Sequence, residues 1–300
     1  MKRKGWFIPI LVFFISTWIL IMYNQSTREP SLAQTSDLAQ LPWDKESSEI
    51  QKIAFSAHSS FIEATRNQNN WVITQPTQSM ADPTYIYNII SQFVSPGVIH
   101  TIETDVTDPS SYGIYEYSPS ITLYDLNNIE YKLIAGNSAD ETTYYTYSPL
   151  TKCIYTIKKE IFDFVSTDLS YWRSKDYLTF SAQNTSKINI SFEGRMHTLL
   201  PSTGEDGIHF YSETLSTDKV NSIIAFLSTS KVETFIMDQA PNHIASSYGF
   251  DTPALAITIY ENSGVSKSFT FTLPQDKPFY YALDKSNNNI YKVPLFKMGS

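Results

Sequence analysis

The feature that most constrains the fold of this chain is an internal repeat. Residues 110–114 (SSYGI) recur as 246–250 (SSYGF), and residues 121–125 (ITLYD) recur as 257–261 (ITIYE). Four further dipeptides recur in the same order: Tyr144-Tyr145 with Tyr280-Tyr281, Ile154-Tyr155 with Ile290-Tyr291, Lys52-Ile53 with Lys187-Ile188, and Ile89-Ile90 with Ile223-Ile224. Self-similarity at a nearly constant shift of about 136 residues indicates a duplicated unit. We therefore predict two tandem copies, residues 50–180 with a connecting segment and residues 181–300.

Each copy is predicted to be α+β, a mostly antiparallel, aromatic-rich sheet with one main helix against it. Alternating apolar residues predict strands at 53–63 and 71–74 in copy one, and at 188–192 and 208–211 in copy two. The main helices follow. Asp82 and Ser216 are the predicted N-caps and Pro83 the first helical residue of copy one. Their apolar stripes are Ile86, Ile89, Ile90 and Phe93 in copy one, and Val220, Ile223, Ile224 and Leu227 in copy two.

The Tyr-Gly pairs of the repeat are the structural motif residues that we single out: Tyr112 with Gly113, and Tyr248 with Gly249. Each pair should end a short helix, with the glycine in the left-handed conformation of a C-terminal cap. Strands should then follow at 119–125, 130–135, 142–147 and 152–156, mirrored at 255–261, 267–272, 278–283 and 289–293. Residues 162–180 join the copies.

The N-terminus predicts a transmembrane signal anchor at residues 5–23. Lys2, Arg3 and Lys4 precede an uncharged apolar run that would be about 28 Å long as a helix, enough to span a bilayer core. The basic residues place the tip, residues 1–4, in the cytoplasm and the bulk of the chain outside the cell membrane, with a single pass. Cleavage after a small-x-small site at 31–33 is the alternative. Residues 24–49 read as a flexible stalk, in which Trp43 either docks on the folded part or stays loose.

Composition limits the class of protein. The chain has 300 residues with 42% hydrophobic and 14% aromatic content, ample for a buried core. The net charge of −8 argues against a nucleic-acid-binding surface, and the single Cys allows neither an internal disulfide nor a multi-Cys metal site.

The sequence offers no catalytic, cofactor or metal motif, so none of these residue classes is predicted. Ser216 and Ser228 start S-x-x-K tetrads, but the partner motifs of penicillin-recognising enzymes are missing, and Ser216 fits better as a cap. Cys153 is expected to be a strand thiol, and the acidic cluster of Glu103, Asp105 and Asp108 a solvated loop. The histidines, which lack zinc-site spacing, are His58, His100, His197, His209 and His243. The tyrosines of copy one either line a sugar- or peptide-binding face or are ordinary sheet residues: Tyr85, Tyr87, Tyr112, Tyr115, Tyr117, Tyr124, Tyr144, Tyr145 and Tyr147.

The order of these motifs resembles a known family. Residues 71–73 (WVI) lead to a proline, Ala81-Asp82 opens a helix, Ser-Tyr-Gly precedes a strand, Tyr-Tyr and Ile-Tyr follow, and residues 172–178 read WRSKDYL. This pattern resembles the domain of unknown function family 4340 of bacterial membrane-anchored proteins, over residues 50–298. Copy two departs from it, because it has no Trp at the place of Trp71 and no linker motif after it. Since several such proteins are associated with gliding-type ABC transport systems, the resemblance implies transporter membrane subunits as partners, and it implies no catalytic residues.

Two classes of function follow. The first is a non-enzymatic, membrane-tethered extracytoplasmic accessory or binding protein, such as an auxiliary subunit of an ABC transport system. The second is a cell-envelope ligand-binding protein or an enzyme that acts on glycan, peptide or lipid. The first is favoured because the sequence supplies an anchor and a stalk but no polar catalytic constellation; a sensor is a third reading.

Overall fold

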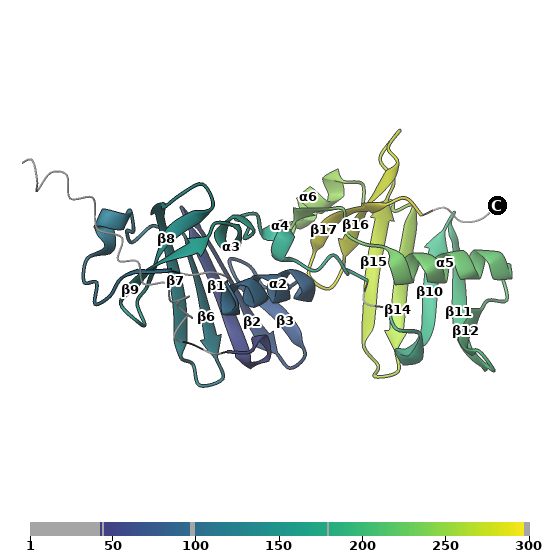
Figure 1. Ribbon diagram of the computed structural model, residues 1–300. Helices are drawn as coiled ribbons and strands as arrows, with labels where there is room; N and C mark the ends of the chain where they lie inside the picture. The colour runs from purple at the N-terminus through teal and green to yellow at the C-terminus, as the bar shows by residue number, and fades with distance from the viewer. Residues whose placement is uncertain (1–42, 44, 97–99, 179, 297–300) are drawn as a thin grey trace, which may run out of the picture. The chain divides into compact units, whose positions relative to one another are not determined.

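The computed structural model describes residues 43, 45–96, 100–178 and 180–296. It consists of two large antiparallel sheets with few helices (Figure 1). The chain is therefore mostly β, and the predicted α+β class holds only in the coarser sense that sheets dominate each half. The predicted anchor at 5–23 and most of the predicted stalk lie outside the described residues. Within the described residues, no helix is long and apolar enough to cross a membrane.

The first sheet has nine strands in the order β4-β3-β2-β1-β6-β7-β8-β9-β5. Its strands are β1 (Ile50–Ala57), β2 (Ser60–Asn67), β3 (Asn70–Gln75), β4 (Ser79–Met80), β5 (His100–Glu103), β6 (Ser120–Asp125), β7 (Glu130–Ser138), β8 (Thr143–Ser148) and β9 (Cys153–Lys158). The helices of this part are η1 (Ser47–Glu49), α2 (Pro83–Val94), η2 (Pro109–Tyr112), α3 (Glu160–Asp163) and α4 (Leu169–Trp172).

The second sheet has eight strands in the order β12-β11-β10-β14-β15-β16-β17-β13. Its strands are β10 (Thr185–Phe192), β11 (Arg195–Gly204), β12 (Gly207–Tyr211), β13 (Thr234–Met237), β14 (Leu255–Glu261), β15 (Ser266–Thr272), β16 (Phe279–Asp284) and β17 (Asn289–Pro294). Its helices are η3 (Ala182–Asn184), α5 (Thr217–Thr229) and α6 (Asn242–Ser247).

Apart from β4, the two sheets share one order of strands, with β1 corresponding to β10 and β6 to β14. The register agrees as well: Lys52 pairs with Tyr124 after an irregularity in β1, and Lys187 pairs with Tyr260 after an irregularity in β10. The residue pairs that the repeat aligns lie in corresponding elements: Ile89 in α2 and Ile223 in α5, Tyr112 and Tyr248 at the ends of η2 and α6, and Tyr145 in β8 and Tyr281 in β16. This is the arrangement that the sequence repeat predicts.

Contacts within the chain define two compact units, each described here by itself. The first comprises the chain up to Ser60 with Ile89–Val165, and the second comprises Phe61–Asn88 with Ser166–Ser300.

In the first unit the folded chain begins before residue 50. Trp43 is buried, stacks on Phe93 with ring centroids 5.7 Å apart, and meets Tyr131 edge-on at 5.5 Å. Lys45 forms an ion pair with Asp125 at 3.3 Å. Of the two alternatives for Trp43, docking is the one observed, because burial of its large apolar ring outweighs the freedom of a polar segment.

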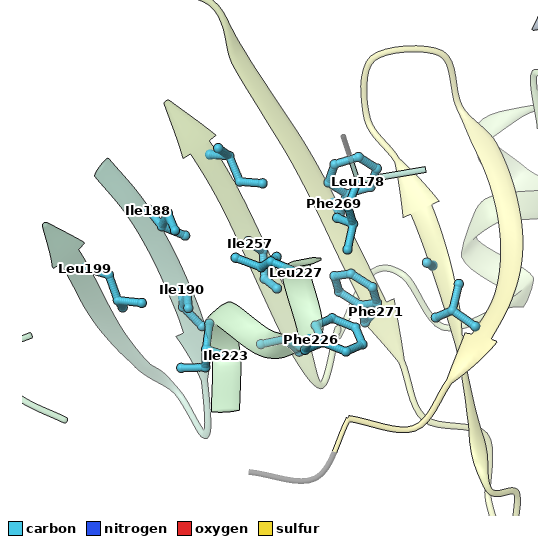
Figure 2. Packing of buried hydrophobic residues seen from close by; sticks show 14 of the residues in the cluster. Leu178, Ile188, Ile190, Leu199, Ile223, Phe226, Leu227, Ile257, Phe269 and Phe271 are labelled. Carbon is cyan, nitrogen blue, oxygen red and sulfur yellow. The ribbon is translucent and has the colours of Figure 1, made fainter. Parts of the chain in front are cut away.

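In the second unit, α5 lies across the eight-stranded sheet (Figure 1). Figure 2 shows Ile223 and Phe226 of this helix among the sheet residues Ile190, Ile257 and Phe271, all of which belong to one buried cluster. Burying each such side chain contributes about 1.5–3 kcal/mol.

The predicted caps differ in the two main helices. Asp82 caps α2, since its Oδ1 accepts hydrogen bonds from the backbone N–H of Thr84 at 2.9 Å and of Tyr85 at 3.1 Å. Ser216 occupies the N-cap position of α5 in extended conformation, but its side chain makes no capping hydrogen bond.

One strand prediction was wrong, and one long strand was missed. The predicted strand at 53–63 is two strands, β1 and β2, because His58 turns the chain with a φ of 56°. β11 was not predicted at all, and it contains Pro201, a residue that is typical of strand edges and bulges.

Candidate functional site

The candidate site is built around a short extended segment that follows α4. Ala81 and Arg173 form an antiparallel bridge, with the N–H of Asp82 donating to the carbonyl of Trp172 at 2.7 Å and the N–H of Ser174 donating to that of Met80 at 2.9 Å. Trp172 is fully buried, and its Nε1 donates to the Ser166 carbonyl at 2.8 Å. The backbone that carries Arg173 is thereby fixed on both sides.

The Arg173 guanidinium makes a two-point contact with Asp238. One terminal nitrogen lies 3.1 Å from Oδ2 and the other 2.7 Å from Oδ1, a geometry that suits a planar guanidinium and a carboxylate. The guanidinium also lies 4.0 Å above the ring centroid of Phe235. Only 5% of Arg173 is exposed, so a charge is held in a largely dry environment by one carboxylate and one aromatic face.

A pocket of about 220 Å³ lies beside this pair. Its residues come from β4, from the Arg173 segment and from β13, β15, β16 and β17: Gln78, Ser79, Met80, Arg173, Ser174, Asp176, Tyr177, Val232, Phe235, Lys267, Phe269, Asp284, Ser286, Asn287, Asn289 and Tyr291. All of them belong to the second unit.

One part of the lining is aromatic. Tyr177 meets Phe269 edge-on and Tyr291 at a tilt, with both pairs of ring centroids 5.7 Å apart, and Phe235 meets Tyr291 edge-on at 6.0 Å. Burial raises the pKa of Tyr291, and a hydrogen bond with Asn289 offsets only part of this rise. Both tyrosines therefore stay neutral at physiological pH, since burial raises the pKa of Tyr177 as well.

The other part of the lining is the polar turn between β16 and β17. Asp284 Oδ1 accepts hydrogen bonds from the N–H of Ser286 at 2.8 Å and from its hydroxyl at 2.6 Å. Asn287 Oδ1 accepts from the N–H of Asn289 at 2.9 Å, and Asn289 Oδ1 accepts from the N–H of Gln239 at 2.9 Å. The amide oxygens thus hold the turn in shape, and each amide group also carries an NH₂ with two donors.

Two atoms of the lining residues are buried polar atoms that lack a hydrogen-bond partner within the described part of the chain. They are the Nε of Arg173 and the Oγ of Ser79. Leaving a buried donor or acceptor unpartnered costs about 1–3 kcal/mol, so native proteins normally supply a protein group, a water or a ligand. Both residues line the pocket, but these two atoms are themselves buried away from its open space.

The predicted motif residues have a structural place outside this lining. Gly113 and Gly249 have φ values of 75° and 83°, which confirms the predicted left-handed caps. Their tyrosines pack alike: the rings of Tyr112 and Tyr145 lie 5.1 Å apart and those of Tyr248 and Tyr281 lie 4.8 Å apart, both edge-on.

The cysteine, acidic and S-x-x-K candidates are not brought together. Cys153 is on β9, as predicted, and its thiol donates to the Thr151 carbonyl at 3.3 Å. Glu103 accepts from the Tyr112 hydroxyl at 2.6 Å. Ser228 donates to the Ile224 carbonyl of its own helix at 2.8 Å. Over the described ranges, no group of three or more His, Cys, Asp or Glu side chains is placed to hold a metal ion.

One histidine does reach a hydroxyl. His197 is buried, its Nδ1 lies 2.8 Å from Thr214 Oγ1, and its ring stacks on Phe192 at 4.7 Å. In the part of the chain that the structure describes, these are the ring's contacts, and a carboxylate that would orient it is not among them. The pair reads as a satisfied strand histidine.

The tyrosines of copy one divide between the two readings. Tyr112, Tyr144, Tyr145 and Tyr147 are only partly exposed, and Tyr144, Tyr145 and Tyr147 belong to β8. Tyr115 and Tyr117 are exposed and stack on each other at 5.6 Å. None of the nine lines the pocket.

Sequence reasoning missed the pocket. From the sequence, Arg173 and Asp176 were part of the connecting motif, Asn287 lay between two predicted strands, and Asn289 was the first residue of a predicted strand. The available signal for a polar site was that these charged and amide residues occur in a chain in which only 17% of the residues are charged.

A scan of the chain against protein-family models and a search of curated proteins each found no match. The fold and site therefore define a class by geometry alone: a mostly β chain of two similar sheets, with a small, mixed polar and aromatic pocket in its second unit. The resemblance to the domain of unknown function family 4340 stays a prediction from sequence.

Proposed function

We propose that this chain is a non-enzymatic binding protein whose second unit holds a small polar ligand in the pocket beside Arg173. The observation that carries the proposal is a pocket of about 220 Å³ whose lining combines the rings of Tyr177, Phe269 and Tyr291 with the polar turn from Asp284 to Asn289. A few placed polar groups with aromatic surface are typical of small-molecule sites.

The cellular setting that we propose comes from the sequence. Residues 5–23 anchor the chain in the cell membrane, residues 1–4 stay in the cytoplasm, and both sheets lie on the extracytoplasmic side. The resemblance supports a role as an accessory subunit of an ABC transport system, in which the pocket would bind a ligand near the transporter. A cell-envelope enzyme acting on glycan, peptide or lipid is the alternative function.

The binding proposal is tested by removing one unpartnered atom. Ser79→Ala in the full-length chain deletes a buried hydroxyl that no group among the described residues satisfies, so the free protein should be as stable as the parent or slightly more stable. The same change should weaken ligand binding measured by calorimetry against a panel of neutral sugars, amino acids and inorganic phosphate.

Ser148→Ala is the matched control. Ser148 Oγ is also buried without a partner, but it belongs to the first unit, outside the pocket. This variant should leave ligand affinity unchanged. If no member of the panel binds the parent protein, or if Ser148→Ala and Ser79→Ala weaken binding equally, the pocket is not the binding site.

The proposed membrane topology and transporter partner are tested separately. A reporter fused after Ser300 should be active only on the extracytoplasmic side, and full-length protein should co-purify with the permease subunits of a transporter. Turnover of an envelope polymer by the parent protein, abolished by a pocket variant, would favour the enzyme.

A further inference from the structure

Three of the charged side chains around the pocket are paired with protein groups of opposite charge, whereas Asp284 is held by hydrogen bonds from Ser286. Arg173 is held by Asp238, and Lys267 lies 2.8 Å from Glu261. Asp176 is paired with Lys231. A ligand carboxylate or phosphate would have to compete with these internal carboxylates for each cation, so the pocket disfavours an acidic ligand.

The polar groups that remain to contact a ligand are two side-chain amides and one carboxylate. The turn offers the amides of Asn287 and Asn289 and the carboxylate of Asp284, on which the two hydrogen bonds from Ser286 occupy only Oδ1. A planar amide both donates and accepts hydrogen bonds and a carboxylate accepts them, so together these groups suit neighbouring hydroxyls on a ligand.

The same pocket also has an aromatic, apolar part. Tyr177, Phe269 and Tyr291 form a contiguous set of rings, each within 5.7 Å of the next. Such rings offer apolar contact area to a flat C–H surface. The ligand must therefore be amphiphilic, with hydroxyl groups at its edge and an apolar face.

The volume of the pocket limits the size of the ligand. The volume of about 220 Å³ lies below the range of about 300–1,000 Å³ that is usual for sites of drug-sized ligands. One six-membered ring with its substituents is about what the pocket can accept.

We infer that the ligand is a polyhydroxylated molecule of monosaccharide size that carries no acidic group, with its hydroxyls on the turn from Asp284 to Asn289 and its C–H face toward Tyr177 and Tyr291. This inference rests on the proposed binding function and specifies its ligand class.

The test compares three classes of probe with the full-length chain by isothermal titration calorimetry. The neutral probes are D-glucose, D-galactose and N-acetyl-D-glucosamine; the others are the amino acids glycine and glutamate, and inorganic phosphate. At least one sugar should bind with one-to-one stoichiometry. Its Kd should change less than twofold when NaCl is raised from about 0.05 M to about 0.5 M, because screening acts on charged ligands.

Variants localise the sugar. Asn287→Ala, at an exposed position of the turn, should raise the Kd about tenfold, in line with loss of one or two hydrogen bonds. The control is Thr151→Ala in the corresponding turn of the first sheet, which should leave the Kd unchanged. If glycine, glutamate or phosphate binds in the pocket and no sugar does, the ligand class is overturned while the binding function stands. If no probe binds, both fail.

Discussion

The turn between β8 and β9 and the turn between β16 and β17 occupy corresponding places in the two sheets, yet they present different chemistry. Their backbones match: the N–H of Lys152 donates to the Ser148 carbonyl at 2.8 Å and that of Asn288 donates to Asp284 at 2.9 Å, with φ values of 55° and 58°. In the first turn, the hydroxyls of Thr151 and Tyr155 contact each other at 2.9 Å. The corresponding Tyr291 of the second sheet lines a pocket.

The two turns therefore share their backbone conformation and differ in a few side chains. Lys52 lies 4.2 Å above the ring of Tyr124, and Lys187 lies 4.5 Å above that of Tyr260. Such contacts hold both sheets in the same form. The substitutions that distinguish the second turn, Asp284, Asn287 and Asn289 in place of Ser148, Thr151 and Cys153, change only what the turn can bind.

The largest expected effect concerns the two main helices. Ile89 and Ile223 are each 1% exposed, and truncation of a buried Ile to Ala costs about 2–5 kcal/mol. Ile89→Ala and Ile223→Ala should therefore each lower the free energy of unfolding, measured by urea denaturation, by similar amounts. A loss at one position with no loss at the other would break the correspondence of the copies.

Replacing the glycine cap should cost more stability in copy one than in copy two. An alanine at either position meets left-handed strain of about 1–2 kcal/mol. At Gly113, a Cβ would also lie 2.2 Å from Asn137 Oδ1, whereas at Gly249 its nearest neighbour is 3.9 Å away. We expect losses of about 2–4 kcal/mol for Gly113→Ala and about 1–2 kcal/mol for Gly249→Ala in thermal unfolding.

A double variant tests the cause. Asn137→Ala removes the group that the new Cβ would strike, so Gly113→Ala in that background should cost no more than Gly249→Ala. An unchanged excess would show that the two caps differ for another reason.

Lowering the pH should remove the stability that one ionised carboxylate contributes to each sheet. For Asp125, burial raises the pKa, but hydrogen bonds that include those from Lys45 and Tyr131 outweigh it and the pKa is lowered; Lys267 lowers that of Glu261. A lowered folded-state pKa gives stability that is present above the unfolded value of about 4 and is lost as pH falls through the folded value. Asp125→Asn should therefore destabilise at pH 7, and its difference from the parent should shrink toward pH 2.

Glu261→Gln should show the same trend with a smaller amplitude, because its side chain is 26% exposed and that of Asp125 is 1% exposed. The check is a series of urea titrations across pH. A gap between parent and Asp125→Asn that widens on acidification would contradict the assignment.

The smallest effect is expected at the tyrosines of the repeat. Tyr112 donates to Glu103 at 2.6 Å, and burial together with Glu103 raises its pKa to about 12. Its contribution is complete below the unfolded pKa of about 10 and is lost as pH rises through about 12. Tyr112→Phe should cost up to about 1 kcal/mol at pH 7 and reduce the alkaline loss of stability, which circular dichroism can follow. Tyr248→Phe, the control, should cost less, since the described contacts of Tyr248 are made by its ring and backbone.

The sequence repeat predicted the strand correspondence and both glycine caps, because spacing and left-handed glycines are local signals. It missed the break at His58, where a non-glycine residue takes a φ of 56° without a Gly, Asn or Pro signal. The pocket could not be predicted in the same way. Arg173 meets Asp238 across 65 positions of sequence, and no pattern in either segment marks the other as its partner.

The short bridge between Ala81 and Arg173 has a consequence for which parts of the chain complete the pocket. A fragment of residues 181–300 would contain every strand of the eight-stranded sheet but neither Arg173, Tyr177 nor Ser79. Such a fragment would keep the turn with Phe235, Phe269 and Tyr291 and lack only the part of the wall that comes before residue 181. For the binding function proposed above, a complete pocket therefore needs chain from both copies of the repeat.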